Sequence, residues 1–227
     1  MSEKEKMLKG EIYNANYDEE LFQERQYAKE LCYEHNNLRP SELEKRKEVI
    51  KKLLGKTKKE FFIEQPFICD YGYNIEIGEN FYSNHNLTIL DANKVKFGDN
   101  VFIGPNCGFY TSGHPIDSKT RNSGLEYAKQ IEVGDNVWIG GNVTVVPGVK
   151  IGNNSVIGAG SVVTKDIPDN SIAVGNPCKV IRKIEIWEKE GRAYFVSFLH
   201  YLVKWHKISP SPKFPKFSTR KIKKRDF

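Results

Sequence analysis

The chain has 227 residues, of which 39% are hydrophobic and 28% are charged, a composition typical of a globular protein with a sizeable core. Its N-terminus, MSEKEKMLKG, is charged, and no apolar run approaches the roughly 20 residues that cross a bilayer, so the sequence argues against a secreted or membrane-spanning protein. The net charge of +6 gathers in the final stretch, KFPKFSTRKIKKRDF, which favours a solvated tail over a nucleic-acid-binding surface.

The four cysteines are widely spaced and form no CxxC pair. This spacing predicts reduced thiols in a cytoplasmic protein rather than a disulfide framework or a zinc knuckle.

The first sixty residues carry helical patterns. Asp18 is placed to cap a helix with Leu21, Tyr27 and Leu31 on one face. A second helix is expected to begin at residues 41–44, where Ser41 and Glu44 have the spacing of a capping box. Its expected apolar stripe, followed by a glycine at which the helix would end, consists of Leu43, Ile50, Leu53, Leu54 and then Gly55.

From about Ile75 the period of the chain becomes six, as in FGDNVF, IGPNCG, VGDNVW, IGGNVT, IGNNSV and IGAGSV. This period fits neither a helix nor a simple strand, and it predicts short strands joined by tight turns with one large side chain pointing inward in each strand. Repeats of six residues indicate a parallel β-solenoid. The expected inward positions are Phe97, Ile103, Phe109, Val133, Ile139, Val145, Ile151, Ile157 and Val163.

Glycine and asparagine recur at fixed places in these repeats. We expect the glycines after the aliphatic positions and the turn asparagines to occupy bends where φ can be positive. We also expect small residues at the fifth position of each six to fill the corners. The glycines are Gly134, Gly140, Gly152 and Gly158, the asparagines are Asn100, Asn136 and Asn154, and the corner residues are Val143, Ser155 and Ser161.

The expected fold therefore has an all-β core, a left-handed parallel β-helix, with a helical cap at its N-terminus and a helical and tail extension at its C-terminus. We place the cap at residues 1–60, the solenoid at 61–183 and the extension at 184–227. The last of these contains a helical stripe, Tyr194, Phe198, Leu202 and Trp205, followed by a proline- and lysine-rich tail. The repeat is interrupted after Gly113-His114-Pro115, where residues 115–130 form a polar loop.

Residues 8 to 184 resemble the maltose/galactoside O-acetyltransferase family of hexapeptide-repeat acyltransferases. The shared stretches include GEIYNANYDEEL, RPSELEKR, NFYSNHNLTILDANKVKFGDNVFIGPN, YTSGHPID, RNSGLEY, GDNVWIGGNVTVVPGVKIGNNSVIGAGSVVTKDIP and VGNPCKVIRKI. The resemblance implies an acetyl-coenzyme A-dependent O-acetyltransferase that acts on a hydroxyl of a maltose-, glucose- or galactoside-like sugar. It further implies a homotrimer with active sites between subunits and no metal requirement.

For the catalytic residues, the resemblance implies that His114 is the general base in a direct attack on the thioester, with loop 115–130 as the lid. Asn84 matches the asparagine that stabilises the oxyanion, and Glu126 is a candidate for orienting His114, although a solvated loop glutamate is an equal alternative. The expected acceptor-binding residues are Ser83, Asp91 and Asp70.

For the cofactor, the resemblance implies that acetyl-coenzyme A contacts Asn84 and a group of residues in the later repeats. Trp138 is expected to line the pantetheine arm, and the two basic residues of PCKVIRKI to meet the nucleotide phosphates. The group consists of Trp138, Gly141, Ala159, Thr164, Lys165, Lys179 and Arg182.

Three other functions remain open at this point. A serine or antibiotic O-acetyltransferase would use the same fold and base. A zinc hydratase would need three protein ligands, of which His85 and His114 supply two. A non-catalytic scaffold would use the solenoid as an assembly surface, with the basic tail as a binding arm.

Overall fold

The computed structural model describes residues 1–184, which fall within one compact unit. The helix and tail expected beyond residue 184 lie outside the described residues. In the part of the chain that the structure describes, no helix is both long and apolar enough to span a membrane.

Three helices form the N-terminal part: α1 (Glu3–Lys9), α2 (Glu19–Asn37) and α3 (Leu43–Leu53). The predicted cap of α2 is confirmed, because the Asp18 carboxylate accepts a hydrogen bond from the Leu21 N–H at 2.9 Å. The predicted face is wrong at Tyr27, which is 62% exposed. The buried residues of α2 are instead Leu21, Ala28, Leu31, Cys32 and His35.

The expected capping box of α3 is also wrong. The helix starts one residue later than the box requires, with Glu42 at the N-cap and no side-chain capping bond. The Glu42 carboxylate instead accepts a hydrogen bond from the Arg39 N–H at 3.0 Å. Leu43 consequently lies at the exposed start of the helix, whereas Ile50, Leu53 and Leu54 are buried as expected.

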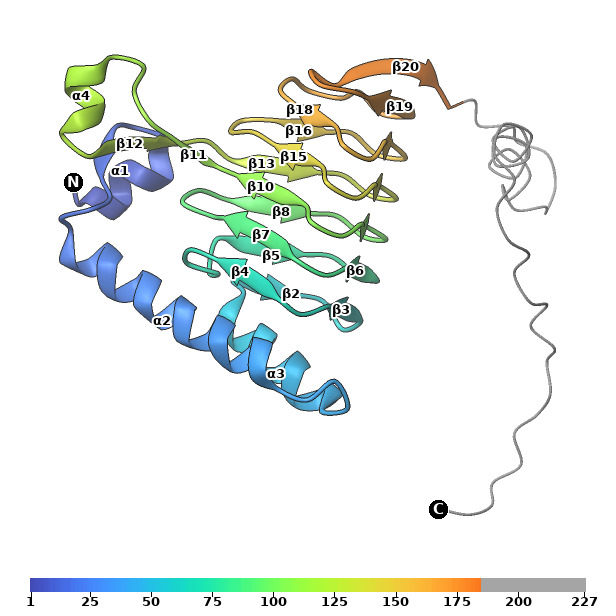
Figure 1. The fold of residues 1–227 in the computed structure, drawn as a ribbon, viewed down its shortest axis with the longest axis horizontal. Coiled ribbons are helices and arrows are strands. Elements are labelled where there is room, and N and C mark those ends of the chain that lie inside the picture. The colour runs from blue at the N-terminus through green and yellow to red at the C-terminus, as the bar shows by residue number, and fades with distance from the viewer. Residues whose placement is uncertain (185–227) are drawn as a thin grey trace, which may run out of the picture. The chain divides into compact units, whose positions relative to one another are not determined.

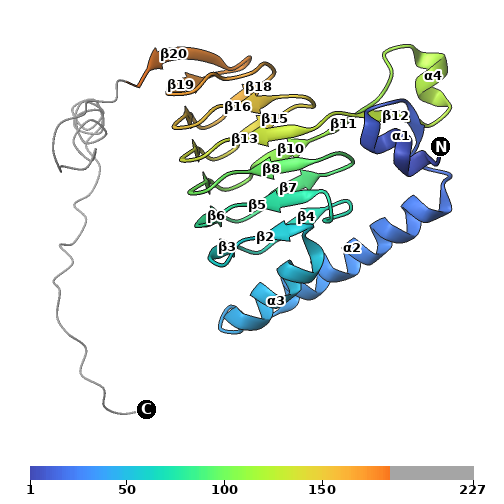
Figure 2. The same cartoon turned by 180° about the vertical axis from the view of Figure 1, so that it is seen from behind.

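The predicted parallel β-helix is confirmed as a solenoid with three faces, in which successive coils stack in register (Figures 1 and 2). One face contains β4 (Phe67–Cys69), β7 (Leu87–Leu90), β10 (Gly108–Tyr110), β15 (Thr144–Val145) and β18 (Val162–Val163). A second face contains β2 (Lys56–Thr57), β5 (Ile75–Ile77), β8 (Val95–Phe97), β13 (Ile131–Val133) and β16 (Lys150–Ile151).

The third face has seven strands and ends in an antiparallel strand. It contains β3 (Phe61–Ile63), β6 (Phe81–Ser83), β9 (Phe102–Ile103), β14 (Trp138–Ile139), β17 (Val156–Ile157), β19 (Ser171–Val174) and the antiparallel β20 (Lys179–Lys183). The solenoid thus begins at β2, earlier than the repeat at Ile75 suggested.

The interior of the solenoid is filled as the repeat predicts, because all nine expected inward positions are buried. The larger rings pack on one another: Phe97 lies 5.1 Å from Phe81 and 5.0 Å from Phe109, between ring centroids. The same hydrophobic cluster continues into α2 and α3. The helices therefore close the N-terminal end of the solenoid, where they lie beside β2, β3 and β4 in Figure 1.

The turn asparagines confirm their prediction, since Asn100, Asn136 and Asn154 have φ between 54° and 56°. Their side chains also form a hydrogen-bonded ladder from coil to coil, with Asn100 donating to Asn136 at 3.1 Å and Asn136 to Asn154 at 3.0 Å. This ladder ties together turns that a short strand alone would hold by few backbone bonds.

The prediction that the four repeat glycines occupy bends with positive φ is wrong, because none of them has a positive φ. They are needed where coils approach closely. A Cβ atom at Gly152 would lie 2.2 Å from Asp169 Oδ1, and one at Gly140 would lie 2.6 Å from the Ala159 nitrogen. Gly78 is needed for the same reason, because a Cβ atom at this position would lie only 2.2 Å from the backbone oxygen of Gly98.

The loop that interrupts the repeat is ordered and projects from the stack of coils (Figure 1). It contains the short helix α4 (Ser118–Asn122), capped by Asp117, and the strand β12 (Leu125–Ala128). β12 pairs with β11 (Ser112–Gly113) on one side and with β1 (Tyr13–Asn14) on the other, both antiparallel. The N-terminal segment is therefore part of the structure that holds the loop.

Replacing Gly78 by alanine is expected to destabilise the protein by about 1–3 kcal/mol, because a Cβ would force neighbouring backbones apart. The free energy of unfolding, measured in denaturant, checks this. Lys96→Ala, on an exposed position of the same face, is the control and should change it by less than about 0.5 kcal/mol. An equally small effect of Gly78→Ala would show that the coils can separate without cost.

Candidate active site

The face containing β4, β7, β10, β15 and β18, hereafter the β10 face, separates the predicted site residues into two groups. Because its strands are parallel, all of them start at one edge and end at the other. Asn84 precedes β7, Gly141 precedes β15 and Ala159 precedes β18, so these three lie at the edge where the strands start, the entry edge.

The other group lies at the edge where the same strands end, the exit edge. Asp70 follows β4, Asp91 follows β7, His114 comes after β10 and β11, and Thr164 and Lys165 follow β18. The strands of this face advance by roughly 3.3 Å per residue, so its two edges are separated by about 10 Å. His114 and Asn84 of one chain therefore lie on opposite sides of the β10 face.

His114 is exposed and directly follows β11. Its Nδ1 lies 3.4 Å from the carbonyl oxygen of Leu125 in β12. A carbonyl oxygen can only accept, so this contact requires Nδ1 to carry the proton and leaves Nε2 with the lone pair. The pairing of β11 with β12, Gly113 opposite Tyr127, sets the ring beside that carbonyl.

Glu126, the predicted orienting residue, accepts a hydrogen bond from the Tyr13 hydroxyl at 3.0 Å. Tyr13 and Glu126 also face each other in the β1–β12 pairing. The ring contact of His114 is made by the neighbouring Leu125 carbonyl, so an orienting role for Glu126 stays a prediction. Tyr13 was not anticipated as part of this region, although it stands within the GEIYNAN stretch that carries the resemblance.

Asn84 is half-buried, and its side-chain oxygen accepts a hydrogen bond from the His85 N–H at 2.7 Å. The backbone N–H of Asn84 donates to the Ile103 carbonyl at 2.9 Å. These two contacts fix the residue on the corner before β7 and hold its amide oxygen against the main chain. The chemically relevant group for an oxyanion is then the side-chain NH2.

Asp91 is fully buried, and its Oδ1 accepts hydrogen bonds from the N–H groups of Asp70 at 3.0 Å and Tyr71 at 2.9 Å. Burial raises the pKa of Asp91 to about 7, and the nearby Asp70 carboxylate acts in the same direction. Asp91 thus shapes the turn that presents Asp70. Contact of Asp91 with an acceptor stays a prediction, as does that of Ser83, whose side chain is also fully buried.

Asp70 is half-buried at the exit edge, and burial raises its pKa to about 6 while the charge of Arg25 opposes the rise. Arg25 donates to the Tyr71 hydroxyl at 2.6 Å and to the Ala15 carbonyl at 2.7 Å. The turn after β4 is consequently tied to α2 and to the segment around β1. No sequence pattern pointed to Arg25, because it acts across a long sequence separation.

The residues predicted for the cofactor fit a long anionic ligand. Trp138 is 43% exposed and belongs to a continuous outward-facing row on the seven-stranded face. The row, in strand register, is Phe62, Tyr82, Phe102, Trp138, Val156 and Ile172. Lys165, Lys179 and Arg182 are exposed cations, and Arg182 lies opposite Ile172 in the β19–β20 pairing.

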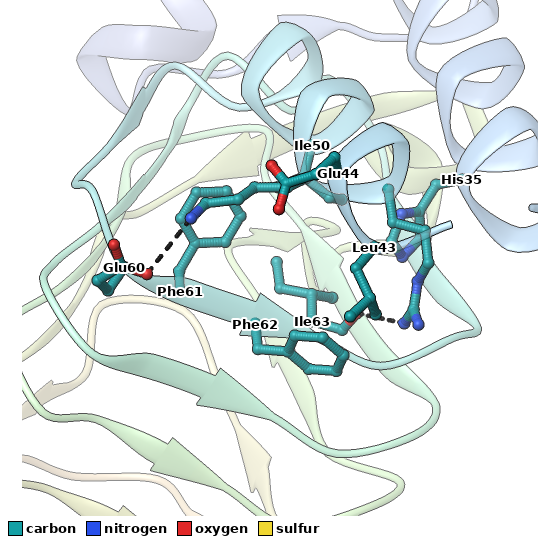
Figure 3. Close-up of a pocket in the computed structure, with 10 residues that line it drawn as sticks. His35, Leu43, Glu44, Ile50, Glu60, Phe61, Phe62 and Ile63 are labelled. Atoms are coloured by element: carbon teal, nitrogen blue, oxygen red, sulfur yellow. Dashed lines mark hydrogen bonds and ion pairs between the residues drawn. The ribbon is translucent and has the colours of Figure 1, made fainter. Parts of the chain in front are cut away.

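Two cavities of the single chain lie away from the predicted site residues. One, of about 180 Å³, lies between α2, α3 and β3 and is lined by His35, Leu43 and Phe62 among others (Figure 3). Another, of about 450 Å³, runs over the face that contains β8. In residues 1–184, no group of three His, Cys, Asp or Glu side chains is arranged to hold a metal ion.

Two family models match the chain. The maltose acetyltransferase hexapeptide capping motif matches residues 6–58, which include all of α2 and α3. The bacterial transferase hexapeptide model, with six repeats, matches residues 131–165 in the later coils.

Known proteins match over most of the chain. The galactoside O-acetyltransferase of Escherichia coli is 45% identical over 193 residues, which are 85% of this chain and 90% of that protein. The crystal structure of a maltose O-acetyltransferase from Clostridium difficile has a TM-score of 0.80 at 55% identity and covers 82% of this chain and 98% of its own. A galactoside acetyltransferase in complex with coenzyme A has a TM-score of 0.79 at 44% identity, and the match covers 85% of this chain and 98% of that one.

The capped solenoid with a projecting histidine loop defines an acetyltransferase of the hexapeptide-repeat class that uses acetyl-coenzyme A as co-substrate. The likeness extends over both the cap and the repeats. The chain belongs to the maltose/galactoside O-acetyltransferase family.

Asp91→Asn is expected to flatten the dependence of stability on pH. Because the pKa of Asp91 is raised from 3.8 to about 7, the native state keeps a proton that the unfolded chain has lost. This contribution is complete below pH 3.8 and declines as pH rises towards 7, by at most about 1.4 kcal/mol per pH unit.

Denaturant unfolding at pH 5, 6, 7 and 8 measures the effect, and the decline should be smaller in Asp91→Asn than in the wild type. Asp135→Asn, at an exposed corner, should keep the wild-type profile. Identical profiles for wild type and Asp91→Asn would contradict the assignment of the proton to Asp91.

Proposed function

We propose that the protein transfers the acetyl group of acetyl-coenzyme A to a hydroxyl of a sugar of the maltose, glucose or galactoside type. The observation that carries the proposal is the His114 ring, exposed after β11 with its Nδ1 against the Leu125 carbonyl. That contact leaves Nε2 to accept a proton, which is what a hydroxyl nucleophile requires. The names of the similar proteins support this acceptor class.

His114 acts as general base in a direct transfer. As the acceptor oxygen attacks the thioester carbonyl carbon, Nε2 takes the hydroxyl proton. The side-chain NH2 of Asn84 donates to the oxygen on which negative charge develops. When the carbon–sulfur bond breaks, the imidazolium returns the proton to the leaving sulfur, so no acetyl-enzyme forms.

Asp70 positions the acceptor, because it presents a half-buried carboxylate at the same edge as His114. A carboxylate accepts hydrogen bonds from the vicinal hydroxyls of a sugar. Asp91 supports it from below by holding the backbone of the turn. Loop 115–130 forms the wall of the pocket, and Tyr13 braces it through Glu126.

The row around Trp138 receives the pantetheine arm, and Gly141 and Ala159 at the entry edge allow it to pass closely. Thr164, Lys165, Lys179 and Arg182 are exposed and meet its polar and phosphate groups. The bound ligand supplies the activated acetyl group, while this chain supplies the apolar row and the cations that orient it.

The active protein is a homotrimer with each site between two subunits. Support comes from the two edges of the β10 face, because His114 and the entry-edge residues cannot reach one thioester within a single chain. Placing the exit edge of one subunit beside the entry edge of the next unites them.

His114→Ala is expected to lower turnover by about 10²–10⁴-fold, since it removes the proton acceptor. Thiol release from acetyl-coenzyme A, measured with maltose, glucose, galactosides, serine and chloramphenicol, tests the base and the acceptor class together. Binding of coenzyme A, measured by calorimetry, should be unchanged in the variant. Release with serine or chloramphenicol alone would replace the sugar assignment, and full activity of His114→Ala would remove the proposed base.

Mixing two inactive variants tests the location of the site. Chains carrying His114→Ala and chains carrying Asn84→Ala, co-expressed, should recover about a quarter of the wild-type activity in a randomly mixed trimer, because one interface in four pairs an intact His114 with an intact Asn84. Each variant expressed alone should stay nearly inactive. Failure to recover activity in mixed trimers of confirmed mass would place both residues in one subunit's site.

A further inference from the structure

Two of the four cysteines, although 37 positions apart in the sequence, meet in the structure. The Sγ atoms of Cys32 in α2 and Cys69 in β4 are 3.7 Å apart, and both side chains are buried. The pair therefore joins the helical cap to the first coil of the β10 face. Each of the four cysteines is a free thiol in this structure.

The approach of the two thiols is held by a neighbouring pair of hydrogen bonds. The Asn36 side chain donates to the Phe67 carbonyl at 2.8 Å and accepts from the Phe67 N–H at 2.8 Å. Cys32 is four residues before Asn36, about 6 Å along a helix, and Cys69 is two residues after Phe67, about 6.6 Å along a strand. The two rises match, so the Asn36 clamp sets the sulfurs opposite each other.

The two sulfurs are chemically unequal. The hydrogen bond with Cys69 lowers the pKa of Cys32, and burial opposes this effect. The same hydrogen bond, together with burial, raises the pKa of Cys69. The directions of these two pKa shifts favour Cys32 over Cys69 as the attacking sulfur.

We propose that Cys32 and Cys69 are a redox pair that forms a disulfide between the cap and the solenoid on exposure to hydrogen peroxide. The Cys32 sulfur attacks the peroxide oxygen, the O–O bond breaks, and a sulfenic acid and one water form. The Cys69 sulfur then attacks the Cys32 sulfur. The S–S bond forms, the S–O bond breaks, and the departing hydroxide takes the Cys69 proton to leave as a second water.

The linkage acts on the turn that holds the acceptor side of the enzyme. Disulfide formation shortens the sulfur separation from 3.7 Å to about 2.05 Å, which draws β4 towards α2. Cys69 is directly followed by Asp70, whose N–H is bound to Asp91. The inference stands on the cap and the first coil alone and is independent of which acceptor the enzyme uses.

The test uses the intact native protein, treated with hydrogen peroxide and then alkylated before digestion so that free thiols cannot exchange. Trypsin places the four cysteines in four different peptides, residues 30–45, 60–94, 97–119 and 166–179. We expect a reducible species that links peptide 30–45 to peptide 60–94. Cys32→Ser and Cys69→Ser should each abolish it, and Cys107→Ser should retain it.

A cross-link between other cysteines, or oxidation of Cys32 to the sulfinic acid without linkage, would overturn the proposal. So would free thiols at both positions at peroxide concentrations that oxidise the denatured chain, a measurement on the wild type that needs no folded variant. The midpoint of thermal unfolding should rise by about 5 °C or more in the linked form, because the bond closes a long loop. An unchanged or lower midpoint would overturn the inference that the bond fastens the cap.

Discussion

The close stacking of short coils is the constraint on which the rest of this protein depends. Each parallel strand of the coils has only two to four residues and so makes few backbone hydrogen bonds. The coils must therefore approach closely enough for side-chain ladders and inward rings to add to them. Glycine at the corners permits that approach, and the asparagine ladder and the edge-to-face contact of Phe97 with Phe109 depend on it. A repetitive surface follows directly, and the cavity over the face that contains β8 is lined by none of the predicted site residues.

Chemistry therefore has to be added to the solenoid by departures from the repeat. The loop after Gly113 is the main departure, and it is stabilised by residues from far away in the chain. β12 is held between β11 and the N-terminal β1, and the Tyr13–Glu126 hydrogen bond closes the arrangement. The cap thus has two tasks: it covers the open end of the coils, and its leading segment braces the loop that carries His114.

Two carboxyl groups at the exit edge, Asp91 and Asp70, differ in how deeply they are buried. Asp91 is inside the protein and holds the turn after β4, whereas Asp70, one coil of the solenoid away, is partly accessible. Both carboxyl groups resemble acceptor-binding residues when only the sequence is considered. Burial distinguishes their positions, because Asp91 has no exposed surface and bonds to the backbone of the turn, and the raised pKa of Asp91 is the electrostatic consequence of that position.

By itself, the sequence determined the solenoid, its inward residues, the turn asparagines with positive φ, the cap of α2 and the family, because each of these depends on local period and residue type. The tertiary structure decided what depends on distant neighbours. It decided why the corner glycines are needed, that Tyr27 and Leu43 face outward, and that His114 and Asn84 lie at opposite edges of one face. It also brought Cys32 to Cys69 and Tyr13 to Glu126, since packing between elements far apart in the chain leaves no periodic trace in the sequence.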